Sequence, residues 1–283
     1  MSPSRQPGIR ARLEVRRDVA EGLAVFRVHL DADFTFMPGQ YATLWLTHGG
    51  RTIPRPYSIA SSPSSPRTLE FYINLVEHGR LTPSLWEPDV VRALAAGTPE
   101  TTLLVTGPHG RMVLEPAEKR DLVLVASGTG LSPFMSMIRS EEERFQASPE
   151  TYERRRIYVI HGVSYSANLG YRGELEALAN QTLADPARKL GLVYLPTISR
   201  PQMDRLWRGL TGRAETIFEG RGAYDAPRPL DLEVRATIRS MLRPDRHAVY
   251  VCGHPGTIDN TVRILTGLGF RPRIDLKCEK YYA

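Results

Sequence analysis

A glycine-rich turn between a strand and a helix is the first place where this chain could bind a ligand. Leu122–Ala126 is an unbroken apolar run, which is typical of a parallel strand buried on both faces. Gly128, Thr129 and Gly130 follow it, and glycine lets the backbone adopt positive φ and come close to a ligand. Ser132-Pro133 then predicts an N-cap followed by proline at the first helical position. Backbone N–H groups and the positive end of a helix dipole would meet there, where a pyrophosphate could bind. The third glycine of the dinucleotide fingerprint is missing, so an ordinary strand-to-helix turn remains an alternative.

A second string, Arg55-Pro56-Tyr57-Ser58, combines three side chains suited to a phosphorylated aromatic ligand. A guanidinium can hold a phosphate in a forked pair, a tyrosine ring can stack on a flat heterocycle, and a serine hydroxyl can hydrogen-bond a ring nitrogen. The alternative is an ordinary strand. Further on, Gly79-Arg80-Leu81-Thr82 is typical of a turn entering a helix, where backbone amides and a hydroxyl can meet phosphate.

Composition narrows the class of protein. The chain has 283 residues, enough for two domains, and its 41% hydrophobic and 24% charged residues are ordinary for a globular protein. Its formal net charge of +6 suits an acidic partner or a phosphorylated ligand. The arginines are scattered along the chain and are not interleaved with an aromatic platform, so we expect no direct binding of nucleic acid.

The chain has two cysteines, Cys252 and Cys278. A zinc site or a four-cysteine iron–sulfur cluster cannot be built from them, so we predict no metal site. No apolar run approaches the roughly 20 residues that span a membrane. Met1–Gly8 lacks the apolar region of a secretory signal, so we expect a cytoplasmic protein without membrane insertion.

The two halves of the chain have different patterns. From Ile9 to Glu118, short strands alternate with glycine and proline turns, which predicts a closed antiparallel β-barrel with one helical turn near Ser84–Ala95. The predicted strands are Arg12–Arg17, Leu23–Leu30, Tyr41–Leu46, Tyr57–Ala60, Leu69–Val76 and Leu103–Val105. From Asp121 onward strands alternate with helices, which predicts an α/β domain with an open parallel sheet.

In this second half, strands are predicted at Leu122–Ala126, Ile157–His161, Leu192–Pro196 and Ala248–Cys252, with a final edge strand at Leu276–Cys278, and helices at Glu174–Thr182 and Ile258–Leu268. Ligands of such sheets bind beyond the carboxyl ends of the strands. Several candidates follow those ends directly: Thr129, Gly130, Tyr165, Arg200 and Gly253–Pro255. We predict domains at residues 9–118 and 119–283.

Six motifs together resemble the ferredoxin–NADP reductase superfamily in content and order. They are Arg55-Pro56-Tyr57-Ser58, Gly79 to Thr82, Gly107-Pro108-His109-Gly110, Gly128-Thr129-Gly130 with Pro133, Cys252-Gly253-His254-Pro255, and Glu279-Lys280-Tyr281. The resemblance extends from Arg10 to Ala283. Any one of these motifs is weak evidence for the family, but six motifs in the same order are strong evidence.

The resemblance implies that FAD binds the barrel. Arg55, with Pro56 in the same string, would bind the FAD pyrophosphate, Tyr57 would stack on the flavin, and Ser58 would lie close to flavin N5, which accepts hydride. Further contacts to the phosphates would come from the backbone of Gly79 and Leu81 and from Thr82.

It also implies that NADP binds the second domain, around Gly128, Thr129, Gly130 and Pro133 and around Gly253 and Pro255. Ser199, Arg200 and Arg213 stand where bacterial members hold the adenosine 2′-phosphate, which favours NADPH over NADH. Two departures from the family pattern are visible: Gly162–Tyr165 lacks a further arginine, and His254 replaces a common asparagine. We interpret this histidine as structural.

Four residues would act near the nicotinamide according to the resemblance. Cys252 would lie beside it, and Glu279 would position it or relay a proton. Tyr281 would cover the flavin face, although Tyr282 is an alternative because the chain continues past Tyr281. Ser58 completes this group.

The predicted function is hydride transfer between NADPH and FAD, followed by single-electron transfer to ferredoxin or flavodoxin, which are acidic carriers suited to a +6 protein. An alternative is a reductase of an oxygenase component, a haem protein or free flavin. A different class, a module that binds flavin or nucleotide without turnover, shares the motifs but does not need Ser58, Glu279 and a flavin-covering tyrosine.

Overall fold

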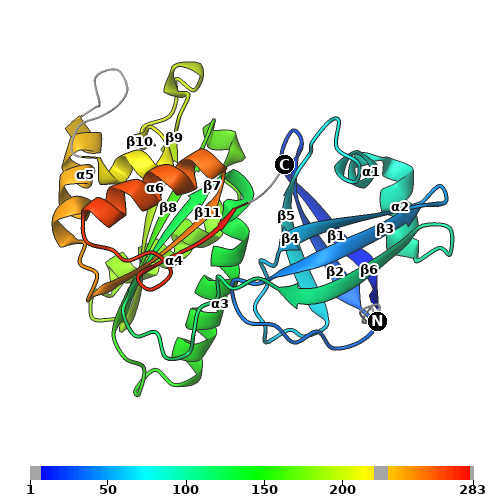
Figure 1. Ribbon diagram of the computed structural model, residues 1–283, viewed down its shortest axis with the longest axis horizontal. Helices are drawn as coiled ribbons and strands as arrows, with labels where there is room; N and C mark the ends of the chain where they lie inside the picture. Colours follow the sequence, from blue (N-terminus) through cyan, green and yellow to red (C-terminus); the bar gives the residue numbers. More distant parts are fainter. Residues whose placement is uncertain (1–7, 220–228, 281–283) are drawn as a thin grey trace. The chain divides into compact units, whose positions relative to one another are not determined.

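The computed structural model describes residues 8–219 and 229–280. The chain divides into two compact units (Figure 1). One unit comprises Met1–Val113 with Met135–Ser140, and the other comprises Leu114–Phe134 with Glu141–Ala283. Among the described residues, no helix has both the length and the apolar character needed to cross a membrane.

The first unit is built on an antiparallel sheet whose order is β4-β3-β6-β1-β2-β5 (Figure 1). Its strands are β1 (Ile9–Ala20), β2 (Leu23–Leu30), β3 (Tyr41–His48), β4 (Arg51–Ser58), β5 (Thr68–Asn74) and β6 (Thr102–His109). An antiparallel bridge between Ile59 and Phe71 joins the β4 edge to the β5 edge. The sheet therefore closes on itself, and the predicted barrel is confirmed.

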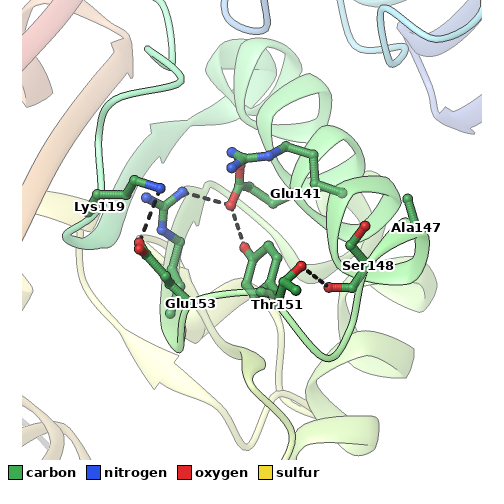
Figure 2. Close-up of a pocket in the computed structure, with 9 residues that line it drawn as sticks. Lys119, Glu141, Ala147, Ser148, Thr151 and Glu153 are labelled. Carbon is green, nitrogen blue, oxygen red and sulfur yellow. Dashed lines mark hydrogen bonds and ion pairs between the residues drawn. The ribbon is translucent and has the colours of Figure 1, made fainter.

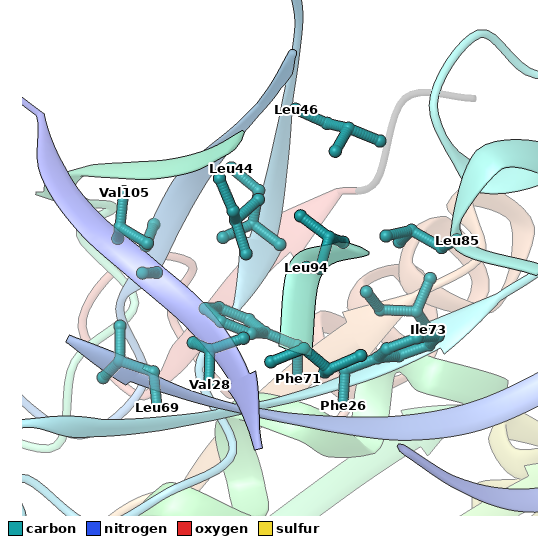
Figure 3. Close-up of a cluster of buried hydrophobic side chains, with 14 of the residues drawn as sticks. Phe26, Val28, Leu44, Leu46, Leu69, Phe71, Ile73, Leu85, Leu94 and Val105 are labelled. Carbon is teal, nitrogen blue, oxygen red and sulfur yellow. The ribbon is translucent and has the colours of Figure 1, made fainter. Parts of the chain in front are cut away.

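The barrel encloses one hydrophobic core (Figure 3). Burial alternates along β3, where Leu44 and Leu46 face inward between half-exposed neighbours. Two helices, α1 (Thr82–Trp86) and α2 (Pro88–Ala96), contribute Leu85 and Leu94 to the same core. Full burial of such a side chain stabilises the fold by roughly 1.5–3 kcal/mol. The start of α1, which carries one of the predicted motifs, is thereby anchored to the barrel.

The strand β4 begins earlier than the sequence pattern predicted. It starts at Arg51 rather than at Tyr57, so all of Arg55–Ser58 lies within the strand. Pro54 and Pro56 occupy alternate positions, and alternate residues of a strand direct their nitrogens to the same side. The two prolines therefore remove N–H donors from one side of β4 only, and the donors on its other side are retained.

The second unit contains a sheet whose order is β10-β9-β8-β7-β11-β12, with every neighbouring pair parallel. Its strands are β7 (Asp121–Ser127), β8 (Arg155–Val163), β9 (Leu190–Ile198), β10 (Leu210–Thr211), β11 (His247–Gly253) and β12 (Leu276–Lys280). The prediction of an α/β unit with an open parallel sheet is confirmed, and β12 forms an edge of the sheet as expected.

In the described part of this unit, four α-helices and four short 3₁₀ helices connect the strands. They are α3 (Ser132–Ala147), α4 (Arg172–Ala184), α5 (Pro229–Met241) and α6 (Pro255–Gly267), with η1 (Gly128–Leu131), η2 (Ser166–Asn168), η3 (Pro201–Met203) and η4 (Ala214–Phe218). Val123 and Val251 of the sheet share one core with Ile238 of α5 and Ile258 of α6, so these two helices cover the same face.

Other features also differ from the sequence prediction. One helical turn was predicted near Ser84–Ala95, where the structure has the two helices α1 and α2, and neither β10 nor α5 was predicted. Ser132 is not the N-cap of α3, because η1 runs directly into the helix and leaves Ser132 with helical backbone angles, φ −47° and ψ −57°. The cap position falls on Leu131, the last residue of η1, which also has helical backbone angles (φ −68°, ψ −24°) and makes no side-chain capping hydrogen bond.

Candidate active site

The register of the barrel brings the two predicted motifs of the first unit to one edge. Ile59 of the segment after β4 pairs antiparallel with Phe71 of β5. Moving back along β4 toward Arg55 therefore means moving forward along β5 toward Gly79. The ring of Tyr57 meets the ring of Phe71 edge-on, with 6.4 Å between centroids. The motif at Arg55–Ser58 thus lies in β4, and the motif at Gly79–Thr82 follows the end of the neighbouring strand β5.

The side chains of β4 are suited to an aromatic, phosphorylated ligand. Arg55 uses Nη1 to donate to the carbonyl of Pro54 at 2.8 Å, and a guanidinium has five N–H donors in total. Burial raises the pKa of Tyr57 well above its ordinary value, against a smaller opposite effect of the Arg55 charge. The phenol therefore stays neutral at physiological pH. Ser58 is buried at the end of the strand.

The turn before α1 is tightly closed. A side chain at Gly79 would place Cβ 2.9 Å from the carbonyl oxygen of Val76. The hydroxyl of Thr82 donates to that same carbonyl at 3.1 Å and accepts from the Val76 N–H at 3.0 Å. Leu81 is buried and belongs to the hydrophobic core of the barrel. The hydroxyl of Thr82 is thus engaged in holding the turn, and its predicted contact with phosphate would require this proton to be redirected.

In the second unit, the strand order reverses direction between β7 and β11. In open parallel sheets, ligands bind outside the carboxyl ends of the strands at such a switch point. The residues that follow β7 are Gly128, Thr129 and Gly130, and those that end and follow β11 are Gly253 and His254. The topology therefore places the two glycine-containing turns side by side at the expected edge.

These two turns interlock through their glycines. A Cβ at Gly130 would lie 2.3 Å from the carbonyl oxygen of Cys252, and a Cβ at Gly253 would lie 2.3 Å from Oγ of Ser127. Gly253 has φ +123° and Gly128 has φ +55°, both in the region that favours glycine. The close approach of the turns excludes larger residues at Gly130 and Gly253.

His254 fixes the start of α6. Its backbone N–H donates to Ser127 Oγ at 2.7 Å, and its Nδ1 accepts from the N–H of Gly256 at 3.0 Å. The imidazole therefore acts as the N-cap of α6, with Pro255 as the first helical residue. Its interpretation as a structural residue is confirmed. Pro133 has the corresponding place in the first turn of α3.

The two arginines predicted to hold a 2′-phosphate are brought together by β10. Thr211 pairs in parallel with Ile198, and the N–H of Gly212 donates to the Ile198 carbonyl at 2.9 Å. Arg200 and Arg213 each lie two residues beyond the end of one of these paired strands, and both side chains are exposed. Ser199 is exposed beside Arg200.

Tyr165 occupies the segment that lacks the further arginine. Its hydroxyl accepts from Nη1 of Arg200 at 2.9 Å, and the Arg200 guanidinium lies 5.5 Å from the centre of its ring. The tyrosine orients Arg200 by a hydrogen bond and a cation–π contact, without contributing a positive charge.

Cys252 and Glu279 lie opposite each other on β11 and β12. Cys252 is fully buried. Burial raises the pKa of Glu279 to about 7, and its Oε2 has no hydrogen-bond partner among the described residues. A carboxyl group with this pKa exchanges its proton near neutral pH, as the predicted role of proton relay requires. Tyr281 and Tyr282 lie outside the described residues.

Comparisons with known proteins agree with this geometry. The family model of the oxidoreductase FAD-binding domain matches residues 10–113, and that of the oxidoreductase NAD-binding domain matches residues 124–263. A curated relative, the ferredoxin–NADP reductase of Azotobacter vinelandii, is 30% identical over 255 residues, which cover 87% of this chain and 84% of that protein. The chain belongs to the ferredoxin–NADP reductase family.

Membership in the ferredoxin–NADP reductase family makes the chain an oxidoreductase that uses FAD and a nicotinamide dinucleotide. The fold agrees with a solved ferredoxin NADP⁺ reductase from Neisseria gonorrhoeae, which has a TM-score of 0.71, 20% identity and 98% coverage of both chains. The phenol hydroxylase P5 protein of Acinetobacter pittii is 27% identical over 88% of this chain and 59% of that protein. The proteins similar to this chain therefore include both ferredoxin–NADP reductases and a phenol hydroxylase protein.

Sequence reasoning missed a buried histidine beside the glycine turn of this ferredoxin–NADP reductase family member. His161, near the carboxyl end of β8, is fully buried, with Nε2 3.2 Å from the carbonyl oxygen of Gly128 and Nδ1 3.3 Å from the hydroxyl of Tyr194. Burial lowers its pKa to about 4, against the opposite effect of the Gly128 hydrogen bond. The neutral imidazole can donate to Gly128 and accept from Tyr194. A histidine at a strand end, beside the predicted glycine turn, was the available signal.

A pocket of about 350 Å³ lies away from these turns, at the amino ends of β7 and β8 (Figure 2). Its buried carboxylate, Glu141, accepts from Arg144, Arg155 and Tyr152, while Lys119 pairs with Glu153 at 3.1 Å. The charged side chains of this pocket are paired with one another. We interpret it as an ion cluster that joins α3 to the start of β8.

Proposed function

We propose that the chain oxidises NADPH and passes the electrons singly to an acidic carrier, a ferredoxin or a flavodoxin. Residues 9–118 would bind FAD, and residues 119–283 would bind NADPH. When bound, FAD supplies the step from a hydride to single electrons, because its ring accepts hydride at N5 and releases electrons one at a time. A cytoplasmic location is part of the same proposal.

In the first unit, Arg55 would hold the FAD pyrophosphate with the guanidinium donors that Pro54 does not use. The neutral ring of Tyr57 would stack on the flavin, and Ser58 would hydrogen-bond near N5. The backbone of Gly79 and Leu81 would complete the phosphate contacts.

In the second unit, the interlocked turns around Gly130 and Gly253 would bind the nicotinamide half of the dinucleotide beside Cys252. Glu279, opposite Cys252, would hold or release a proton near neutral pH. The side chains of Arg200 and Arg213, which follow two adjacent strands, would bind the 2′-phosphate.

The observation that carries the choice of NADPH is the parallel register of Thr211 with Ile198. It places two exposed arginines, thirteen positions apart in the sequence, at adjacent strand ends. The 2′-phosphate of NADPH would gain charge-assisted hydrogen bonds from two guanidinium groups, whereas NADH has no 2′-phosphate for them to bind.

The observation that supports an acidic carrier is the net charge of +6. A carrier that docks, receives one electron and leaves benefits from electrostatic steering without a large interface. The test is the reduction of ferredoxins, flavodoxins and free flavins by purified protein with NADPH at several salt concentrations. Raising salt from about 0.05 M to above 0.2 M shortens the Debye length to less than about 8 Å, so carrier reduction should slow.

Reduction of a small neutral acceptor is the control, because it needs no charged docking. Equal salt dependence in both assays, or none in either, would reject electrostatic docking. A second candidate function, reduction of an oxygenase component, a haem protein or free flavin, would then be favoured. The similarity to a phenol hydroxylase component supports that candidate.

A further inference from the structure

The turn that carries Arg213 is held by two side chains of α5. Asp231 accepts from Thr211 twice, with Oδ1 2.8 Å from the backbone N and Oδ2 2.5 Å from the hydroxyl. Nη2 of Arg235 donates to the carbonyl of Thr211 at 3.1 Å and to the hydroxyl oxygen of Thr216 at 3.2 Å. Residues four positions apart lie on one face of a helix, so both side chains meet the turn from the same side.

A hydrogen-bond relay connects Arg235 to the backbone of Arg213. The Thr216 hydroxyl, which accepts from Arg235, donates to the carbonyl of Arg213 at 2.7 Å. Gly212 has φ +112°, and a Cβ there would lie 2.6 Å from Thr216 Oγ1 and 3.1 Å from Arg235 Nη2. The backbone on both sides of Gly212 therefore packs directly against the side chains of this relay.

Packing alone does not account for a guanidinium in this position. Arg235 is 7% exposed, and its Nη1 is buried without a hydrogen-bond partner among the described residues. Burial of a charged group that is incompletely hydrogen-bonded is unfavourable, and apolar side chains of similar volume often replace such groups without loss of stability. The observed contacts of Arg235 all converge on the turn that ends in Arg213.

We propose that Arg235 is a positioning residue for the 2′-phosphate of NADPH. Together with Asp231 and Thr216, it fixes the turn so that Arg213 lies at the strand end beside Arg200. This inference rests on the proposed role of Arg213. It predicts that Arg235 contributes to the preference for NADPH over NADH without touching either nucleotide.

The test compares Arg235→Met and Thr216→Val with the unchanged protein, in steady-state reduction of a neutral artificial acceptor by NADPH and by NADH. Both variants break the relay at nearly constant volume. The KM for NADPH should rise about five- to tenfold, while kcat at saturating NADPH and the KM for NADH stay within twofold. Thr216→Val keeps the test decisive if Arg235→Met does not fold.

Arg239→Met is the matched control. Arg239 lies one turn further along α5 and donates to the carbonyl of Phe218 at 3.2 Å, with no hydrogen bond to the Thr211–Thr216 turn. Its removal should leave the KM for both nucleotides unchanged. An effect equal to that of Arg235→Met would mean that damage to α5, and not the relay, changes nucleotide binding, which would overturn the proposal.

A double-mutant cycle separates positioning from other effects. In an Arg213→Ala background, Arg235→Met should have no further effect on the KM for NADPH. A persistent effect, or equal rises for NADPH and NADH, would overturn the proposal. If Arg213→Ala alone leaves NADPH kinetics unchanged, the proposed role of Arg213 fails as well. If Arg213→Ala weakens NADPH binding but Arg235→Met and Thr216→Val do not, only the positioning role fails.

Discussion

Replacement of Gly130 by alanine should damage both stability and turnover. The new Cβ would lie 2.3 Å from the Cys252 carbonyl oxygen and 2.8 Å from Cα of Gly253. An ordinary van der Waals contact begins near 3.4 Å, so the backbone of β11 would have to move by about 1 Å. Cys252 pairs with Ala126 of β7 and Glu279 of β12, and these ladders resist such a shift.

The cost of overpacking a well-packed interior is about 1–3 kcal/mol. At roughly 2–4 °C per kcal/mol for domains of this size, the Tm should fall by about 2 to 12 °C. A displacement of about 1 Å beside the reacting group should also lower kcat by up to about 10²-fold. The measurements are thermal unfolding followed by circular dichroism and steady-state reduction of an artificial acceptor.

Gly173→Ala is the matched control, because a Cβ at Gly173 would meet no described atom within 4 Å beyond its chain neighbours and its own helix backbone, and its φ is not positive. This change should leave kcat unaltered and stabilise the protein slightly, by about 0.4–1 kcal/mol. If Gly130→Ala has the same Tm and the same kcat as Gly173→Ala, the two glycine turns do not interlock as described.

Three further changes test the site. Arg55→Ala should lose most of its bound FAD, because a charge-assisted phosphate contact is worth about 1.5–3 kcal/mol; protein that keeps its yellow colour through gel filtration would contradict the assignment. Arg200→Ala combined with Arg213→Ala should raise the KM for NADPH with little change in kcat, because the 2′-phosphate is remote from the reacting carbon; unchanged NADPH kinetics would make both arginines ordinary surface charges. Burial raises the pKa of Glu279 from 4.5 to about 7, so its stabilising contribution is complete below about pH 4.5 and is lost as pH rises through 7. Urea unfolding at several pH values should therefore show the unchanged protein losing stability relative to Glu279→Gln across this range, and parallel curves would refute the raised pKa.

Local pattern was enough to predict the main elements and motifs. The apolar run of β7 has only one environment that suits it, a strand buried on both faces, and the glycines after it permit a turn that other residues resist. The alternation of strands and turns before Glu118 predicted the barrel, and the string Arg55–Ser58 indicated a phosphorylated aromatic ligand, which the family resemblance then implied to be FAD. These signals are local because they depend on periodicity and on backbone freedom.

Tertiary structure decided which distant residues meet. Arg200 and Arg213 become neighbours only because β10 pairs in parallel with β9, and Cys252 meets Glu279 only through the register of β11 with β12. No local pattern encodes register between strands separated by helices. Ser132 illustrates the same limit, since a cap residue was predicted where η1 continues into α3.

The residues that hold the site in place were the least visible in the sequence. His161, Asp231 and Arg235 resemble ordinary strand or helix residues until burial and hydrogen-bond partners are known. Their partners include backbone groups of the turns at Gly128 and Thr211, together with the hydroxyl groups of Tyr194, Thr211 and Thr216. Since every residue offers the same backbone groups, residue type alone carries no information about such contacts, and only the folded chain determines which carbonyl a side chain reaches.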